Sequence, residues 1–210
     1  EHQVQWIVED SGAKLALTDT ESNRRLYDHL VLNEEGKAPL RDSPTQLKRT
    51  LSFATGAVGA LTTDGREVED SVIDERISKI QHDDLASLVY TSGTTGRPKG
   101  AMLAHCNIIH SSMVFVSCLK LTKADRSIAA VPLAHVTGAV ANVTTMARCA
   151  GALIIMPEFK AAEYLKVAAR ERVSYTVMVP AMYNLCLMQP DFDSYDLSSW
   201  RIGGDRKSVV

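Results

Sequence analysis

The sequence lacks the features that mark several large classes of protein. Lysine and arginine number 23 against 25 aspartates and glutamates, a formal net charge of −2, so no basic excess points to nucleic acid as a partner. No apolar run approaches the roughly 18 to 20 residues of a membrane-spanning helix, and we expect no integral membrane span. Hydrophobic residues at 45% and charged residues at 23% fit a globular protein with one core or two small lobes.

Cysteines and metal-ligand clusters are also scarce. The four cysteines stand far apart with no CxxC pair, and no secretory signal is visible, so we predict reduced thiols in a cytoplasmic protein. Cys106 and His110 are four residues apart and could share a helical face. Two further ligands at suitable spacing are missing, so we predict no metal site and interpret the pair as packing.

From residue 85 onward the sequence contains a regular alternation. Four short apolar runs, "ASLVYTS", "SIAAVP", "GALIIMP" and "SYTVMVP", are separated by stretches of helical character. In one such stretch, Ala161, Leu165 and Ala168 form an apolar stripe. Near-continuous apolar strands alternating with such helices predict an α/β fold, with doubly wound, mostly parallel sheets and helices on both faces.

The first part of the chain has a weaker pattern. A helix through Val4 and Val8 is predicted to lead into a strand at "AKLALTD", followed by a helix at "ESNRRLYDHL" and a second strand at "LVLNEE". Residues 36–84 are more polar, and we expect a linking region with one or two short helices there. The predicted domains are an incomplete first α/β subdomain with this linking region, residues 1–83, and a truncated second α/β subdomain, residues 84–204.

Both ends of the chain look cut. It begins without an initiator methionine and already inside a helical pattern. The last residues, "DRKSVV" (205–210), are charged and unpatterned, and they resemble the translation of a common sequencing adapter. We expect them to be a non-native tail on a fragment of a longer chain.

The stretch "YTSGTTGRPKG", Tyr90 to Gly100, concentrates glycine, hydroxyl groups and one lysine after an apolar strand. Its glycines permit close backbone approach, its successive N–H groups can cradle an anion, and the helix predicted from residue 104 would reinforce that site. A solvated turn is the plain alternative. The stretch is not a P-loop, because Gly100 stands where a P-loop has Ser or Thr, and it does not match GxGxxG. The chemistry therefore indicates a polyphosphate, and hence a nucleotide.

The longer string "LVYTSGTTGRPKGAMLAH" closely resembles the signature of the adenylate-forming (AMP-binding) superfamily. This superfamily includes acyl-CoA synthetases, aryl-CoA ligases, luciferases and peptide-synthetase adenylation domains. The segment "AAVPLAHVTG" resembles the PLxHxxG-like segment of acyl- and aryl-CoA ligases, where peptide synthetases usually have Phe-Asp-x-Ser. The resemblance favours the CoA-ligase branch. A peptide-synthetase-type adenylation domain and a non-catalytic nucleotide-binding fragment are the alternatives.

The resemblance also implies which residues act. It implies that the glycine-rich stretch encloses the β- and γ-phosphates of ATP and that His135 lies beside the substrate carboxylate as a candidate catalytic residue. A hydrogen-bonded structural histidine is the alternative for His135. The predicted acyl-pocket residues, for which core packing is the alternative, are Met178, Val179, Met182 and Tyr183. The predicted phosphate-binding residues are Thr91, Ser92, Gly93, Thr94, Thr95, Gly96 and Lys99.

By the same resemblance, the reaction activates a fatty or aryl carboxylic acid with ATP and Mg²⁺ and then forms a thioester with CoA as co-substrate. The family's adenine- and ribose-binding segments and its small C-terminal domain, which carries the catalytic lysine, are missing from this sequence. Lys99 does not replace that lysine. We therefore expect the missing C-terminal domain of the same chain as a partner, and negligible adenylation activity from these residues alone.

Overall fold

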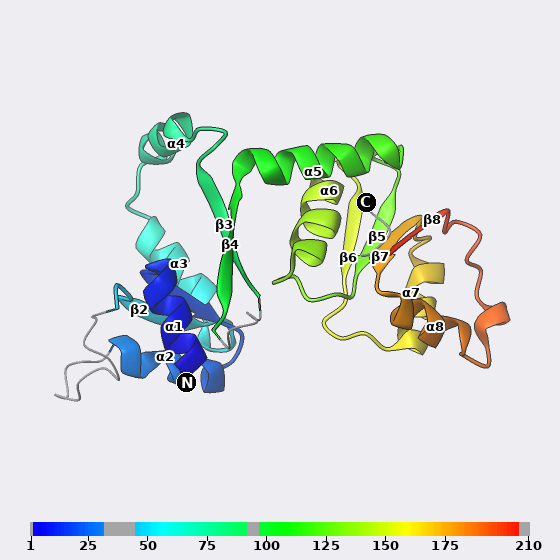
Figure 1. Cartoon of the computed structure of the whole chain (residues 1–210), viewed down its shortest axis with the longest axis horizontal. Helices are drawn as coiled ribbons and strands as arrows, with labels where there is room; N and C mark the ends of the chain where they lie inside the picture. The colour runs from blue at the N-terminus through cyan, green and yellow to red at the C-terminus, as the bar shows by residue number, and fades with distance from the viewer. Residues whose placement is uncertain (1, 32–44, 92–96, 206–210) are drawn as a thin grey trace. The chain divides into compact units, whose positions relative to one another are not determined.

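The computed structural model describes residues 2–31, 45–91 and 97–205, and the chain divides into two compact units, Glu1–Met102 and Leu103–Val210 (Figure 1). The division between the units comes after the glycine-rich stretch. The subdomain boundary predicted at residue 83 comes before that stretch and stays a prediction.

The first unit begins as the sequence predicts, with helix α1 (His2–Ser11), strand β1 (Leu15–Thr18) and helix α2 (Glu21–Val31). Val8 on α1 is buried with Leu47 and forms the small core of this unit. The strand predicted at "LVLNEE" is wrong in its first two residues, because they continue α2 to its end; the rest of that string lies outside the described residues.

The polar region that follows contains the two short helices expected there, α3 (Ala57–Gly65) and α4 (Asp70–Lys79). It also contains a strand that the sequence analysis missed, β2 (Arg49–Ser52), which pairs in parallel with β1. Its sequence, "RTLS", has too few apolar residues to predict a strand. It is stabilised by the ladder with β1 rather than by a pattern of its own.

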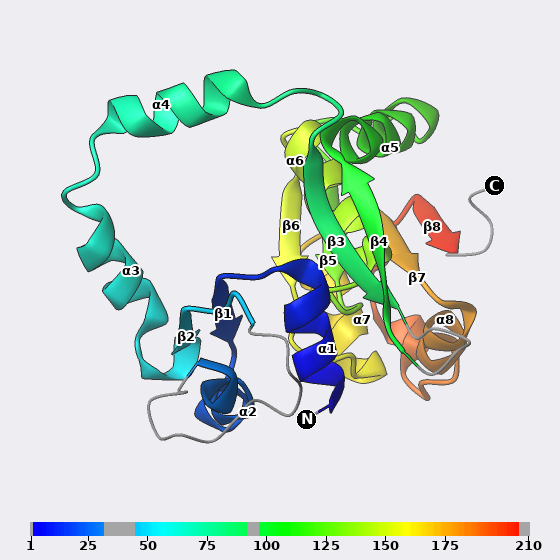
Figure 2. The same cartoon turned by 60° about the vertical axis from the view of Figure 1, so that its left-hand side comes forward.

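Strands β3 (Leu85–Thr91) and β4 (Lys99–Ala104) form a two-stranded sheet, drawn as a twisted ribbon in Figure 2. The connection between them is much shorter than the roughly dozen residues that a parallel crossover needs, so the pair is antiparallel. Here the structure corrects an expectation. The glycine-rich stretch is followed by strand β4, which the sequence analysis did not predict, and the predicted helix begins after that strand, at His105.

The second unit is a four-stranded parallel sheet with the strand order β6-β5-β7-β8. Three of its strands, β5, β6 and β7, are the proline-terminated runs predicted from the sequence. The strand order reverses direction between β5 and β7, which makes this a topological switch point. The elements of the unit are α5 (His105–Cys118), β5 (Arg126–Ala129), the π-helical η3 (Thr137–Thr144), α6 (Thr145–Arg148), β6 (Ala152–Ile155), α7 (Ala161–Arg170), β7 (Tyr175–Met178), α8 (Pro180–Leu187) and β8 (Ile202–Asp205).

Helices cover both faces of this sheet, which confirms the predicted fold class (Figure 1). Side chains alternate along β7: Tyr175 and Val177 pack with α5, η3 and α6 on one face, whereas Met178 packs with α7 and α8 on the other. Ile128 of β5 joins Met178 in the second of these cores, and both are fully buried. The sheet thus holds two apolar cores, one on each face.

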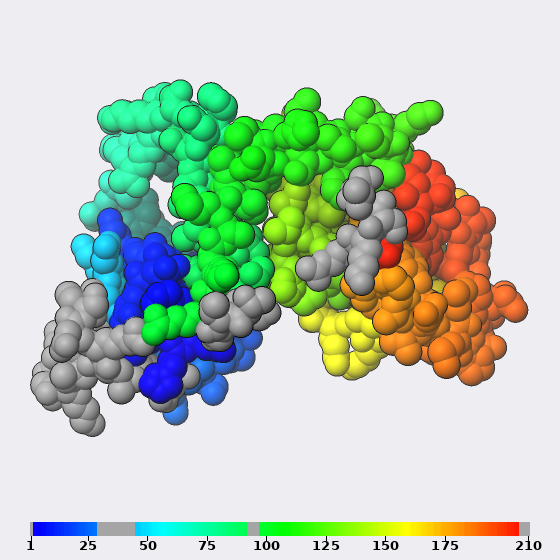
Figure 3. All heavy atoms as spheres, viewed as in Figure 1, coloured from blue at the N-terminus to red at the C-terminus, as the bar shows by residue number. Residues whose placement is uncertain are grey.

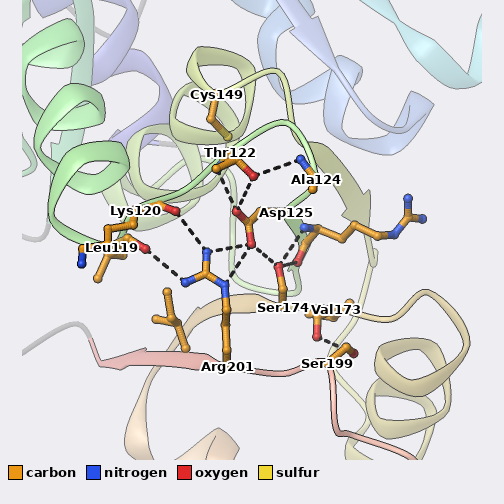
Figure 4. A network of polar contacts seen from close by, with 12 residues as sticks. Leu119, Lys120, Thr122, Ala124, Asp125, Cys149, Val173, Ser174, Ser199 and Arg201 are labelled. Atoms are coloured by element: carbon orange, nitrogen blue, oxygen red, sulfur yellow. Dashed lines mark hydrogen bonds and ion pairs between the residues drawn. The ribbon is translucent and has the colours of Figure 1, made fainter.

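A polar network joins the amino ends of three strands (Figure 4). Asp125 is only 5% exposed and accepts hydrogen bonds from Ser174 Oγ at 2.6 Å and Arg201 Nη2 at 2.8 Å. The backbone N–H of Thr122 donates a third at 2.7 Å. Burial on its own would raise the pKa of Asp125, but these hydrogen bonds and the guanidinium charge outweigh it, so the pKa lies below the ordinary value. The ionised carboxylate of Asp125 therefore links the amino ends of β5, β7 and β8.

Candidate functional site

The two ends of the glycine-rich stretch lie on neighbouring strands. Thr91 is the last residue of β3 and Lys99 is the first of β4, and both are exposed. The strand pair therefore brings these two predicted phosphate-binding residues to the same end of a small sheet. The other five, Ser92, Gly93, Thr94, Thr95 and Gly96, lie outside the described residues, and their role stays a prediction.

Tyr90 and Gly100 pack against each other at the base of this stretch. A Cβ built on Gly100 would come 3.0 Å from Cζ of the Tyr90 ring, a tight contact that would require the ring to shift by a few tenths of an ångström. The Tyr90 hydroxyl donates a hydrogen bond of 2.6 Å to Asp10 Oδ2 on α1. Burial and this bond raise the pKa of Tyr90 to about 12, so the hydroxyl stays a donor at neutral pH. Gly100 thus has a packing role that a phosphate contact would not explain.

Helix α1 also contacts the segment that follows residue 96. The indole N–H of Trp6 donates to the carbonyl oxygen of Pro98 at 3.0 Å. The Arg97 guanidinium carbon lies 4.8 Å from the centroid of the Trp6 ring, within cation–π distance. Figure 3 shows this green segment directly against the blue helix. The strand ends on both sides of residues 92–96 are therefore attached to one helix.

His135 lies in the turn that follows the carboxyl end of β5. Its backbone N–H donates to the Pro132 carbonyl at 3.2 Å, and its own carbonyl accepts from Ala139 N at 2.9 Å, while its side chain is exposed. Gly138 is buried, and its backbone lies close to this turn, since a Cβ there would lie 2.5 Å from the Pro132 oxygen. In open α/β sheets, ligands bind outside the carboxyl ends of the strands at the switch point. The turn places His135 at that end of the sheet, and its role beside a substrate carboxylate stays a prediction.

Two adjoining cavities lie in the second unit. The smaller, of about 140 Å³, is lined by Val136 and Thr137, which directly follow His135. The larger, of about 740 Å³, lies beside β8 between α5 and α8 and falls within the range of small-molecule sites. Phe115 and Val177 belong to the walls of both cavities. The two cavities therefore adjoin at these two side chains, and the smaller one lies next to the residue after His135.

The four predicted acyl-pocket residues are separated by the structure. Tyr183 lines the larger cavity, and its hydroxyl donates to the Gly204 carbonyl at 2.9 Å, which holds α8 against β8. Met178 is fully buried in the core on the α7 and α8 side, and Met182 packs against that core. Val179 precedes the first residue of α8 and is partly buried. Met178 lies off the cavity because side chains alternate along β7, which turns Val177 toward it instead.

A comparison of the sequence with known protein families shows which family the chain belongs to. The sequence matches the family described as AMP-binding enzyme over residues 1–208. The chain belongs to this family. Its glycine-rich stretch therefore lies within an AMP-binding enzyme, and the relatives in the family indicate which branch it resembles.

Three curated relatives are similar over more than half of the chain. YngI of Bacillus subtilis (strain 168), an acyl-CoA synthetase by name, is 38% identical over 138 residues, which is 66% of this chain and 25% of that protein. Indoleacetate–CoA ligase of Aromatoleum aromaticum is 38% identical over 59% of this chain and 24% of its own. The human mitochondrial medium-chain acyl-CoA ligase ACSF2 is 40% identical over 56% of this chain and 20% of its own. The chain thus spans a quarter or less of the length of these relatives.

Solved structures agree with the fold over nearly the whole chain. The N-terminal domain of FACL13 from Mycobacterium tuberculosis superposes with a TM-score of 0.75 at 23% identity, covering 97% of this chain and 47% of that one. ATP-bound MatB from Rhodopseudomonas palustris gives a TM-score of 0.70 at 25% identity, covering 97% and 37%. The first likeness shows the fold alone. Both likenesses agree with the α/β architecture described above.

Sequence reasoning missed several residues that shape the site. Trp6 and Asp10 reach the glycine-rich stretch from 92 and 80 residues away, so no local pattern could reveal the contact. Phe115 and Val177, in contrast, lie on a helix and a strand that were predicted. The sequence did not show which face of each element these side chains occupy. Within the described residues, no helix is long and apolar enough to cross a membrane, and no three His, Cys, Asp or Glu side chains gather as a metal site.

Proposed function

We propose that this chain is the nucleotide- and acid-binding part of an AMP-forming acid–thiol ligase, which activates a fatty or aryl carboxylic acid with ATP and transfers the acyl group to CoA. The string "TSGTTGRPKG", in a chain that belongs to the AMP-binding enzymes over residues 1–208, is the observation that carries this proposal. The names of two relatives support the choice of acid, because one is named for medium-chain acyl groups and another for indoleacetate.

The proposed reaction has two displacement steps. A carboxylate oxygen attacks the α-phosphorus of Mg·ATP, the bond from that phosphorus to the bridging oxygen breaks, and pyrophosphate leaves. The sulfur of CoA then attacks the carbonyl carbon of the acyl-adenylate and loses its proton, and AMP leaves with the bonding pair of the C–O bond. Mg²⁺ enters bound to ATP, as part of the substrate. Positioning and neutralisation of phosphate charge supply most of the acceleration in such reactions.

The predicted phosphate-binding residues, His135 and Tyr183 each have a place in this scheme. Thr91, Lys99 and the five residues of the stretch that lie outside the described part would hold the β- and γ-phosphates. His135 would face the carboxylate, at the switch point of the sheet. The acyl group would occupy the larger cavity, with Tyr183 in its wall and Phe115 and Val177 toward the His135 side.

The first test of this proposal is nucleotide binding without turnover. The 210-residue chain is expected to bind Mg·ATP in isothermal titration calorimetry and to show no pyrophosphate exchange, because the family's catalytic lysine is missing from the sequence. Lys99→Met should weaken binding about tenfold, the loss of one charge-assisted phosphate contact.

Lys79→Met is the matched control for this test. It removes the same charge from an exposed position on α4, where Lys79 pairs with Glu75, so the affinity should be unchanged. Equal affinities of wild type and Lys99→Met would contradict the phosphate role. A strong exchange signal from the 210 residues would overturn the expected inactivity and leave the binding proposal intact.

Cys118 provides a separate test of the acid site. It is exposed and lies in the wall of the larger cavity, whereas Cys106 lies on the same helix outside that wall. Decanoate or indole-3-acetate, at ten times its dissociation constant, should slow alkylation of Cys118 by iodoacetamide about tenfold. Peptide mass spectrometry resolves each cysteine, and the rate at Cys106 should not change. An unchanged rate at Cys118 with both acids would argue against this cavity as the acyl site.

A further inference from the structure

One helix, α1, reaches both strand ends that border residues 92–96. Asp10 accepts the hydrogen bond of Tyr90, two residues before this segment, at 2.6 Å. Trp6 donates to Pro98, two residues after it, at 3.0 Å, and its ring faces the Arg97 guanidinium. Since Trp6 and Asp10 are four residues apart, they lie on the same face of the helix, one turn apart.

The opposite side of α1 is held by the core of the first unit. Val8 is 3% exposed and packs with Leu47, and partly buried Val4, Ala16 and Tyr27 surround them. The helix therefore has one face fixed in the core and another that holds β3 and the start of β4. A rigid element placed in this way limits how far the two strand ends can separate or twist.

We propose that Trp6 and Asp10 are positioning residues that hold the strand ends carrying Thr91 and Lys99 and so set the affinity for the triphosphate. This inference rests on the proposed function. Neither side chain needs to touch the nucleotide. Their effect comes from holding Tyr90 and Pro98. Each of these residues directly precedes a predicted phosphate-binding residue, Thr91 and Lys99 respectively.

The Arg97 contact adds a consequence for charge. The Arg97 side chain is exposed, yet its guanidinium stacks on the Trp6 ring at 4.8 Å, which directs this cation toward α1. Lys99 is exposed at the start of β4. Of these two neighbouring cations, the arrangement assigns Arg97 to the anchor and Lys99 to the phosphates.

The test combines nucleotide affinity with the dynamics of the two strands. Asp10→Ala and Trp6→Leu in the 210-residue chain should each weaken Mg·ATP binding about fivefold by calorimetry, roughly 1 kcal/mol. Both should also speed amide hydrogen exchange in peptides that cover 85–91 and 97–104. Trp6→Phe, which keeps the ring beneath Arg97, should recover part of the affinity. Tyr90→Phe should add little to Asp10→Ala, because both remove the same bond.

Ser52→Ala is the control, since Ser52 is buried in the same unit and its hydroxyl bonds Asp19 and Ala54, outside α1 and both strand ends. It should lower the unfolding midpoint in urea and leave the Mg·ATP affinity unchanged. Unchanged exchange in the two strands, or unchanged affinity in a chain whose wild type binds Mg·ATP, would overturn the anchor alone. A wild-type chain that fails to bind Mg·ATP would overturn the proposed function, and this inference with it.

Discussion

Replacing Gly138 with alanine is expected to lower the free energy of unfolding of the second unit by about 3 kcal/mol. The new methyl group would lie 2.5 Å from the Pro132 oxygen and 2.7 Å from the Leu133 Cα, both backbone atoms that cannot rotate away. Alanine would otherwise be favoured in a helical segment by about 1 kcal/mol. The collision therefore reverses the usual preference, and the turn that carries His135 has to move.

Urea unfolding followed by tryptophan emission in a Trp6→Phe background, where Trp200 of the second unit is the remaining tryptophan, measures this effect. Gly203→Ala is a suitable control, because the nearest atoms to a Cβ there belong to the Tyr183 ring at 3.5 Å, an ordinary contact. A loss below about 1 kcal/mol in Gly138→Ala, comparable to an average substitution, would mean that the turn yields more easily than its contacts indicate.

Replacing Asp125 with asparagine is expected to cost about 3 kcal/mol at pH 7. The carboxylate is almost fully buried, and its loss leaves Arg201 and the Ser174 hydroxyl without their charged acceptor. Glu171→Gln offers a contrast, because the Glu171 pair with Arg126 is partly exposed and screened by solvent, so its loss should cost much less than that of Asp125. Urea midpoints of the two variants at pH 7 give the comparison directly.

Because of the Asp125 carboxylate, we expect the second unit to lose stability in acid. Hydrogen bonds and the Arg201 charge lower the folded-state pKa of Asp125 below that of an unfolded aspartate, about 3.9. Its contribution is therefore present in full above the unfolded pKa and is lost as the pH falls through the folded pKa. Between pH 6 and pH 3, wild type should lose more stability than Asp125→Asn. Parallel losses would show that Asp125 contributes little to the acid lability.

Sequence reasoning recovered the parts of this fold whose signal is local. Strands β5, β6 and β7 are apolar, β-branched and ended by proline, and the stripe of α7 is visible in the letters alone. Strands β2 and β4 were missed because "RTLS" and "KGAMLA" acquire their conformation from a partner strand. Gly100 illustrates the limit best, since its role depends on the ring of Tyr90, a neighbour only after pairing.

The candidate site was predictable to a similar degree. The glycine-rich stretch and His135 came from motif resemblance, which fixes residues but not their surroundings. The facing of Met178 and Val177 depends on strand register, and a shift of one residue would exchange them. The contacts of Trp6 and Asp10 join segments distant in the sequence, so only the folded chain reveals them.

The Asp125 network also bears on the order in which the second unit assembles. Its bonds to Ser174 and Arg201 close loops of 49 and 76 residues, so the entropy of joining those segments is lost before the bonds can form. The amino edge should then close after the nucleus of the sheet. The network should therefore affect mainly the unfolding rate. Its loss should accelerate unfolding and leave the refolding rate nearly unchanged.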